Sequence, residues 1–512
     1  MADTRDPKLV LRKLHAELVS RRGVIEKSHA YYDGAHNLAF AGEKFLEAFG
    51  GLFGAFADNW CGVVANAVEE RLTVQGFRVN QEATADTTAK KIWESNELDL
   101  QSSMGHLDGL ISGAFYATVW TGDTDIPEIT VESAATTIVE CHPKIRRRRT
   151  AALRMYVADD GYEHAELFFP DEVYLYRSRA KRSGIVWDTT RTQWVAEDQL
   201  DVASTLDVNG AMPNPYGVVP VVEFLNLPRL TISHRAGWGA HSELASVIPL
   251  QDAANKLVAD MLVASEFAAF PQRYLTGYTP DDELDATGKP TGRTLAPSFR
   301  SGPGKTWWLE EENAKFGQFA AADLSSSVAS ITLIVQHIAS ISATPPHYLS
   351  AGADRLSGES IKSAESGLVS KARRKARTWG AGWEEVIRLA GLVSGDTSLS
   401  GAESMETIWR DPETRTESEH VDAVVKKKDL DVPAPQLWEE LGYTPEQIAR
   451  FPSLRAQMQL EGMAANAAET ARLAANEAAA LRAASIAATG GAPTLVPTSP
   501  PTPGGFPPNP RP

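Results

Sequence analysis

One glycine-rich segment of this chain has the residue types of a phosphate-binding loop. Residues 302–306 read Gly-Pro-Gly-Lys-Thr, and such a loop holds phosphates with backbone amides and a lysine. However, Phe299 stands where the loop needs a glycine, and the following Trp-Trp-Leu at 307–309 is typical of a strand where a helix is required. We therefore interpret the segment as a tight turn and keep a nucleotide-binding enzyme as an alternative.

The other candidates for catalysis or metal binding are weak. Asp123 and Asp125 could form a metal pair, but they lie in a turn between two strands, where aspartate is common. The eleven histidines form no H-x-x-x-H or H-E-x-x-H pair, and no Gly-x-Ser-x-Gly motif occurs. The two cysteines, Cys61 and Cys141, are too few for a disulfide framework or a cysteine-based zinc site. We expect no catalytic residue, no metal and no cofactor, and hence no enzyme.

Two basic runs could bind anions. Residues 144–149 lie between predicted strands, as a solvated loop or as a contact for nucleic acid or an acidic neighbour. The second run lies on a predicted helix and could be a solvated face offset by local acids, an intersubunit salt-bridge surface or a charge ring near DNA. It comprises Lys371, Arg373, Arg374, Lys375 and Arg377.

Composition limits the classes of function. The 512 residues carry a formal net charge of −16, which argues against tight, static DNA binding but not against a surface that DNA slides past. The low cysteine content fits a reducing compartment, and the first residues show no signal-peptide pattern. The most apolar predicted helix, at 247–270, is interrupted by charged residues, so we expect a soluble protein that does not enter a membrane.

Two predicted helices separated by a proline break organise the chain. In 323–342 apolar residues recur at steps of three and four, Asp323 is the expected N-cap, and the opposite face is small and uncharged. The sequence Thr344-Pro345-Pro346-His347 ends this helix. After a loop at 351–357, a helix of about thirty residues would span roughly 45 Å, which is too long for one compact core.

The remaining elements indicate a mixed α+β fold. Helices are predicted at 7–22, 58–72, 90–110, 247–270, 444–450 and 454–486. A β-meander is predicted from strands at 115–121, 128–132, 151–158, 162–169, 173–177 and 184–188, closed by 218–225. Residues 271–316 read as a small β-rich insert between two long helices, and 407–410 as a lone strand. The Pro-rich end, 489–512, is expected to be disordered.

The order of these parts resembles the portal proteins of tailed bacteriophages, most closely the type of long-tailed actinobacteriophages. The likeness covers roughly 8–455. It is carried by Tyr-Tyr-Asp-Gly at 31–34, Asn-Trp-Cys at 59–61, Glu-Glu-Arg-Leu at 69–72, Gly-Ala-Phe at 113–115, Ile-Ser-Ala-Thr-Pro-Pro-His-Tyr-Leu at 341–349, Ser-Gly-Glu-Ser-Ile-Lys at 357–362 and Trp-Arg-Asp-Pro at 409–412.

The resemblance implies a ring-forming portal fold with named parts. Residues 1–245 correspond to the wing, 246–270 and 317–342 to stem helices, and 271–316 to the clip. Residues 343–357 correspond to the tunnel loop, 358–425 to a spoke helix and wing return, and 426–488 to a helical crown. Within the tunnel loop, Pro345, Pro346, His347, Tyr348 and Arg355 are the residues expected to face DNA.

The resemblance also implies a function. A portal forms a ring, of twelve subunits in this family, at one capsid vertex of the virion, after assembly in the host cytoplasm. Double-stranded DNA passes through it during packaging and ejection, and the expected partners are the terminase large subunit, a head-completion adaptor and the major capsid protein. The alternative is a head or tail structural protein that does not touch DNA.

Overall fold

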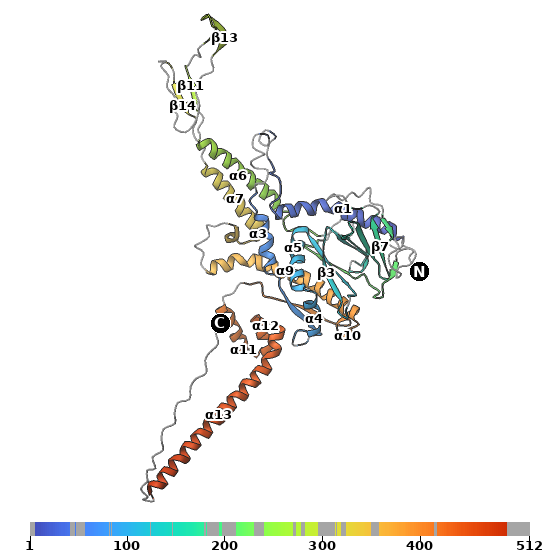
Figure 1. The fold of residues 1–512 in the computed structure, drawn as a ribbon, viewed down its shortest axis with the longest axis vertical. Helices are drawn as coiled ribbons and strands as arrows, with labels where there is room; N and C mark the ends of the chain where they lie inside the picture. The colour runs from blue at the N-terminus through green and yellow to red at the C-terminus, as the bar shows by residue number, and fades with distance from the viewer. Residues whose placement is uncertain are drawn as a thin grey trace, which may run out of the picture. The chain divides into compact units, whose positions relative to one another are not determined.

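The long helix α9 (Gly358–Ser394) packs against both helices and strands of the fold in this computed structural model (Figure 1). The structure describes residues 6–40, 43, 47, 57–80, 82, 84–122, 124–145, 147–178, 181, 194–196, 211–229, 240–269, 273–277, 282–294, 313, 315–318, 324–349, 358–413 and 417–488. They form two compact units, which divide after Pro445.

The N-terminal helix α1 (Pro7–Tyr32) is longer than the sequence predicts. It starts where Asp6 accepts a 2.9 Å hydrogen bond from the backbone N–H of Lys8, with Pro7 in the first turn. The predicted end at Gly23 is wrong, because the helix continues through it. Leu18 before the glycine and Ile25 after it are both buried, so packing outweighs the roughly 1 kcal/mol helix penalty of glycine.

The predicted helix at 90–110 is two helices, α4 (Thr87–Ser95) and α5 (Leu98–Ser112). Between them Glu97 adopts the left-handed conformation with φ 52°. The side chain of Asn96 supports the break by donating to the carbonyl oxygens of Ile92 and Pro127, at 2.9 and 3.0 Å. A local polar side chain therefore replaces the continuing helical hydrogen bonds. The preceding helix, α3, is Trp60–Glu69.

The β-strands form several sheets instead of one meander. The largest has the order β4-β5-β6-β7-β8, with β9 also paired to β7. Its strands are β4 (Thr137–Cys141), β5 (Arg149–Val157), β6 (Glu163–Phe168), β7 (Glu172–Ser178), β8 (Trp194–Ala196) and β9 (Ala211–Pro213). The predicted strand at 184–188 lies outside the described residues.

Two sequence predictions about strand pairing are wrong. The strand at 218–225, β10 (Val221–Leu225), does not close the meander but pairs with β2 (Ala114–Trp120), which also pairs with β3 (Glu128–Ser133). The strand at 407–410, β15 (Met405–Trp409), is not alone, because it pairs antiparallel with β1 (Val74–Val79). Both pairings join segments far apart in the chain, which local sequence patterns do not reveal.

The core beneath α9 is aromatic. Trp379 and Trp383 of α9 pack with Phe115 of β2 and with His106 of α5, all of them fully buried. The indole N–H of Trp383 donates to His106 Nε2 at 3.0 Å, while His106 Nδ1 lies 3.2 Å from the carbonyl oxygen of Leu72. Burial lowers the pKa of His106 to about 3, so this histidine is a neutral structural residue.

Two long helices, α6 (Ile248–Ala269) and α7 (Ser325–Ser342), pack along each other and are joined by a β-rich insert (Figure 1). In the insert β11 (Arg273–Thr276) pairs with β14 (Lys315–Gln318), and β12 (Asp282–Leu284) pairs with β13 (Pro290–Thr294). These elements confirm the predicted helix–insert–helix order. The expected N-cap Asp323 and the strand-like residues 307–309 lie outside the described residues.

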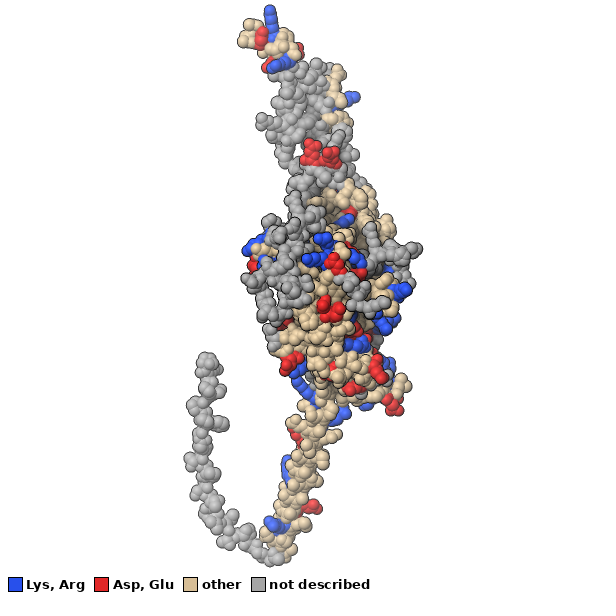
Figure 2. All heavy atoms as spheres, turned by 90° about the vertical axis from the view of Figure 1, so that its right-hand side faces the viewer, with Lys and Arg blue, Asp and Glu red and all other residues tan. Residues whose placement is uncertain are grey.

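The C-terminal elements are helical. After α9 come α10 (Thr397–Ser400), then α11 (Glu417–Lys428) and α12 (Ala434–Glu440). The second unit contains α13 (Pro445–Ala488), which runs through Pro452, so the prediction of two separate helices at 444–450 and 454–486 is wrong. Figure 2 shows the surface of α13 as mostly uncharged, with scattered basic and acidic side chains. The Pro-rich end lies outside the described residues.

Candidate functional site

The surface of α7 is apolar and largely uncovered. Its 18 residues include no Asp, Glu, Lys or Arg, and only four are buried, all in its C-terminal half. The side chains of Val328, Leu333 and Ile341 are 52–56% exposed. By length and composition alone α7 could cross a membrane, with only 22% of it buried in the structure. An uncharged helix this exposed needs a neighbour to cover it.

The small polar residues of α7 satisfy their hydrogen bonds within the helix. The hydroxyls of Ser330, Thr332 and Ser340 donate to the carbonyl oxygens four residues earlier, at 2.9–3.0 Å. These hydroxyls therefore need no hydrogen-bond partner from another helix, and the side chains that remain on the surface are small. Such a surface allows another helix to approach closely. The helix beside it, α6, carries the ion pair of Lys256 and Asp260.

The structure confirms the proline break after α7. The predicted tunnel loop at 343–357, however, does not begin as a loop. Ala343 ends α7 in the left-handed conformation with φ 53°, and its N–H donates to the carbonyl oxygen of Ala339. Pro345 is buried, whereas Pro346 is exposed and begins the one-turn helix α8 (Pro346–Leu349). Proline fits there because the first residue of a helix needs no N–H partner.

The predicted DNA-facing side chains of α8 contact the protein itself. The hydroxyl of Tyr348 accepts a 2.9 Å hydrogen bond from Arg71, whose guanidinium lies 3.6 Å from Glu365 of α9. His347 Nε2 lies 3.7 Å from the same carboxylate. The helix α8 is thus fixed between the end of α3 and α9. Arg355 lies outside the described residues, and DNA contact by Pro345, Pro346, His347 and Tyr348 stays a prediction.

Two of the five basic residues predicted for a charge ring lie inside the subunit. Lys371 Nζ is 2.6 Å from one oxygen of Glu243, and Lys375 Nζ is 2.8 Å from the other. Lys371 also donates to the carbonyl oxygen of Ser342 at the end of α7, and Lys375 donates to the side chain of Asn226 after β10. This buried cluster joins α9 to the chain entering α6 and leaving α7.

The electrostatics of the cluster favour a charged glutamate. Burial alone would raise the pKa of Glu243, but Lys375 and Lys371 outweigh it and hold the pKa at about 2. Burial also lowers the pKa of Lys375, and the glutamate opposes that effect. Sequence patterns did not single out Glu243, because it lies about 130 residues before its partners and has no motif around it.

The other three residues of this basic run, Arg373, Arg374 and Arg377, are exposed. Arg373 lies 3.3 Å from Asp411 and 3.4 Å from Glu413. Of the five residues, these three arginines are therefore the ones that can belong to the predicted intersubunit or channel charge ring. That ring stays a prediction.

The base of α6 is fixed by a buried polar network around Gln251, Asp252 and Asn255. Asp252 accepts a 2.6 Å hydrogen bond from the Tyr31 hydroxyl. Gln251 Oε1 accepts from the backbone N–H of Trp60, at 3.0 Å. The amide of Asn255 lies 3.0 Å from His36 Nε2. In the sequence, this network is indicated only by three polar residues at positions i, i+1 and i+4 of an otherwise apolar helix.

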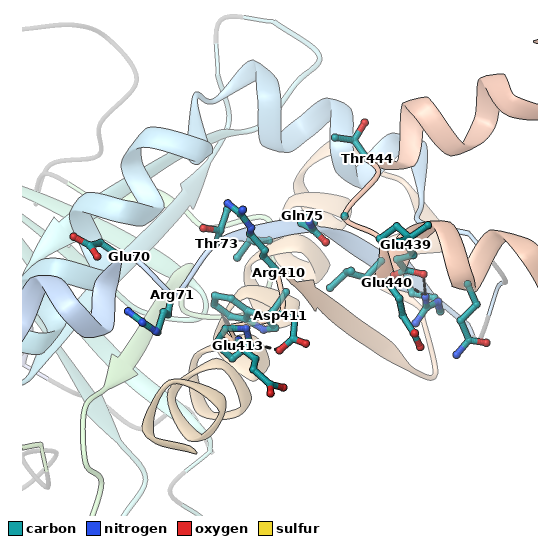
Figure 3. Close-up of a pocket in the computed structure, with 18 of the residues that line it drawn as sticks. Glu70, Arg71, Thr73, Gln75, Arg410, Asp411, Glu413, Glu439, Glu440 and Thr444 are labelled. Atoms are coloured by element: carbon teal, nitrogen blue, oxygen red, sulfur yellow. Dashed lines mark hydrogen bonds and ion pairs between the residues drawn. The ribbon is translucent and has the colours of Figure 1, made fainter. Parts of the chain in front are cut away.

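A cavity of about 1200 Å³ lies between the β1–β15 pair and helices α11 and α12 (Figure 3). Two ion pairs lie within its lining. Arg78 bridges Glu406 and Glu439 at 2.6 Å each, and Lys427 lies 2.6 Å from Glu440. Burial raises the pKa of Glu439, and Arg78 opposes the shift. The arrangement is typical of structural ion pairs and shows no nucleophile with an adjacent base.

Among the residues that the structure describes, no three His, Cys, Asp or Glu side chains lie together as a metal site. The glycine-rich segment at 302–306, considered above for phosphate binding, falls outside them.

A family model and two curated relatives agree on one family. Residues 57–440 match the family model described as phage portal protein, SPP1 Gp6-like. The portal protein of Mycobacterium phage L5 is 30% identical over 375 residues, and that of Mycobacterium phage D29 is 29% identical over 374, each match covering 70% of both chains. A chain from the neck of an empty GTA particle computed with C6 symmetry covers 73% of this chain, and 88% of that chain is matched, at 12% identity and a TM-score of 0.38.

Proposed function

The chain belongs to the SPP1 Gp6-like family of phage portal proteins, and from this premise we propose that it forms a closed ring through which double-stranded DNA enters and leaves a capsid. Twelve subunits is the ring size that the family resemblance implies. The terminase large subunit, a head-completion adaptor and the major capsid protein are the proposed partners. The virion is the proposed location, reached after assembly in the host cytoplasm.

The observation that supports a ring most directly is the uncovered surface of α7. An apolar helix with no charged residue and three large side chains more than half exposed is unfavourable in water. In a ring, the α6–α7 pair of each subunit packs against the pair of the next, which removes this surface from water. The internally satisfied hydroxyls of α7 permit that close packing without new polar partners.

The net negative charge of the chain supports a channel through which DNA passes, in contrast to a surface that binds DNA tightly. Twelve copies at −16 carry a formal charge of about −192, screened by salt beyond roughly 8–10 Å. Within that range an acidic ring repels phosphates, so DNA is not held tightly, and conduction requires weak contacts. The parts of the ring follow the family order proposed above: α6 and α7 as stem, the β11–β14 insert as clip, and the segment from 343 as tunnel loop.

A substitution in α7 tests the ring. Leu333→Asp places a charge on the exposed apolar surface, and we expect it to prevent ring formation while leaving the subunit folded, because Leu333 is 52% exposed. The matched control is Leu460→Asp on α13, at 67% exposure, which we expect to keep the ring. Mass photometry at micromolar concentration reads the assembly state, and circular dichroism confirms folding.

Rings that form equally well with Leu333→Asp would contradict the role of α7. Binding of α7 to lipid vesicles would instead favour the membrane alternative that its length and composition allow. The second candidate function is a head or tail structural protein that does not contact DNA. It predicts that particles with altered Pro345 or Pro346 package DNA normally, whereas the portal proposal predicts intact rings with packaging or retention defects.

A further inference from the structure

The hairpin connecting β4 and β5 presents the basic run at 144–149, which the proposed ring and channel do not use. Cys141 at the end of β4 pairs with Arg149 at the start of β5. The connection between them reads His-Pro-Lys-Ile-Arg-Arg-Arg, so four of its seven residues are Lys or Arg. On a chain with a net charge of −16, this is a local reversal of sign.

The backbone of the connection is held in place by its own hydrogen bonds. The N–H of His142 donates to the carbonyl oxygen of Arg148 at 2.7 Å, and the N–H of Arg148 donates to that of Ile145 at 2.8 Å. The ring nitrogen Nδ1 of His142 accepts from the N–H groups of Lys144 and Ile145, both at 3.2 Å. Because these hydrogen bonds fix the backbone of the turn, binding a partner costs little backbone conformational entropy.

The described cations of the turn are exposed to solvent. Lys144, Arg147 and Arg148 are exposed, and the apolar side chain of Ile145 is 51% exposed among them. Several exposed cations on one turn suit a partner with regularly repeated negative charge.

The carboxylates at the base of the hairpin are already engaged and do not neutralise the tip. Glu140 of β4 lies 2.5 Å from Lys13, and Glu385 of α9 lies 2.8 Å from Arg149. Glu223 of β10 is partly buried and accepts a 3.5 Å hydrogen bond from the thiol of Cys141. The positive charge of Lys144, Arg147 and Arg148 therefore remains available to a partner.

We propose that this basic turn, residues 142–148, binds the phosphate backbone of double-stranded DNA outside the channel, without reading sequence. Arginine-rich tips bind phosphates through their forked N–H groups, and the partner that the proposed function brings to the particle in quantity is DNA. The inference rests on the proposed function and extends it, because it adds a second DNA contact on the wing side of the subunit.

The test uses the assembled full-length ring and a covalently closed DNA minicircle, which cannot thread the channel of a closed ring. The variant is Lys144→Gln/Arg147→Gln/Arg148→Gln, which keeps Arg149 and its pair with Glu385. The control, Lys8→Gln/Arg12→Gln/Lys91→Gln, removes the same charge from exposed cations that are not clustered in one turn. Binding is measured by gel shift between 50 and 200 mM salt, and mass photometry checks the rings in every sample.

We expect wild type and control to bind the minicircle alike. The turn variant should bind about tenfold more weakly or worse, with a salt slope smaller by about 2 to 3, because each phosphate contact contributes about 0.9 to that slope. Intact rings of the turn variant that bind as wild type would overturn the inference, as would an equal loss in the control. Loss of rings in the turn variant alone, with DNA binding kept, would assign the turn to an acidic protein surface instead. Absence of rings in the wild type would contradict the proposed function itself.

Discussion

Glu243→Gln is the substitution whose effect follows most directly from the structure. It leaves two buried ammonium groups, those of Lys371 and Lys375, beside a neutral amide. Removing one charge of a buried ion pair typically lowers the free energy of unfolding by about 3–5 kcal/mol. The depressed pKa of Glu243 gives a similar figure, since the difference between 4.5 and about 2 corresponds to about 3 kcal/mol at neutral pH.

The same pKa fixes the pH dependence. The folded-state pKa of Glu243 lies below its unfolded value, so its contribution to the free energy of unfolding is fully present above pH 4.5 and is lost as the pH falls towards about 2. Wild type should lose this component across that window. The Glu243→Gln variant, which has no carboxyl to protonate, should not.

Urea unfolding followed by tryptophan fluorescence is the appropriate assay, because Trp379 and Trp383 lie on the same helix as the two lysines. The matched control is Glu385→Gln on α9, whose half-exposed pair with Arg149 should contribute less than about 1 kcal/mol. In the double variant Glu243→Gln/Lys371→Met, part of the lost stability should return, since one unpaired charge is gone. An equal, small effect of Glu243→Gln and Glu385→Gln would refute the reasoning.

Two further substitutions test the helices and the core, both by urea unfolding followed by circular dichroism. Gly23→Ala should raise the free energy of unfolding by about 1 kcal/mol, because α1 continues through this residue and nothing lies within 4 Å of an added Cβ; destabilisation would mean that the helix ends there after all. Trp383→Phe should cost about 1–3 kcal/mol, because it leaves Nε2 of the buried His106 without its donor, and an unchanged midpoint would contradict the hydrogen-bonded role of that histidine.

The long helices could be predicted from the sequence because their signals are local. The apolar period of α6, α7 and α9 and the paired prolines at 345 and 346 are contained in the segments themselves. The break between α4 and α5 could not be placed, because it depends on Asn96 reaching the carbonyl oxygen of Pro127. The strand β1 was missed for a similar reason, since its partner β15 is more than 300 residues away.

The candidate site shows the same limit. Five basic residues between 371 and 377 on α9 predict a charged surface, and no local pattern indicates that Lys371 and Lys375 turn inward. Their burial requires Glu243, Asn226 and the end of α7 to be brought together by the fold. The basic run at 144–149, by contrast, is visible in the sequence, and the structure adds that the acids beside it, Glu140 and Glu385, are already paired.

Electron-microscope class averages of the purified full-length chain, viewed down the axis of its assemblies, test the central claim most directly. The proposed function predicts closed rings of twelve subunits with a central opening, in which α6 and α7 of neighbouring subunits pack side by side. Only monomers and dimers at micromolar concentration would contradict it.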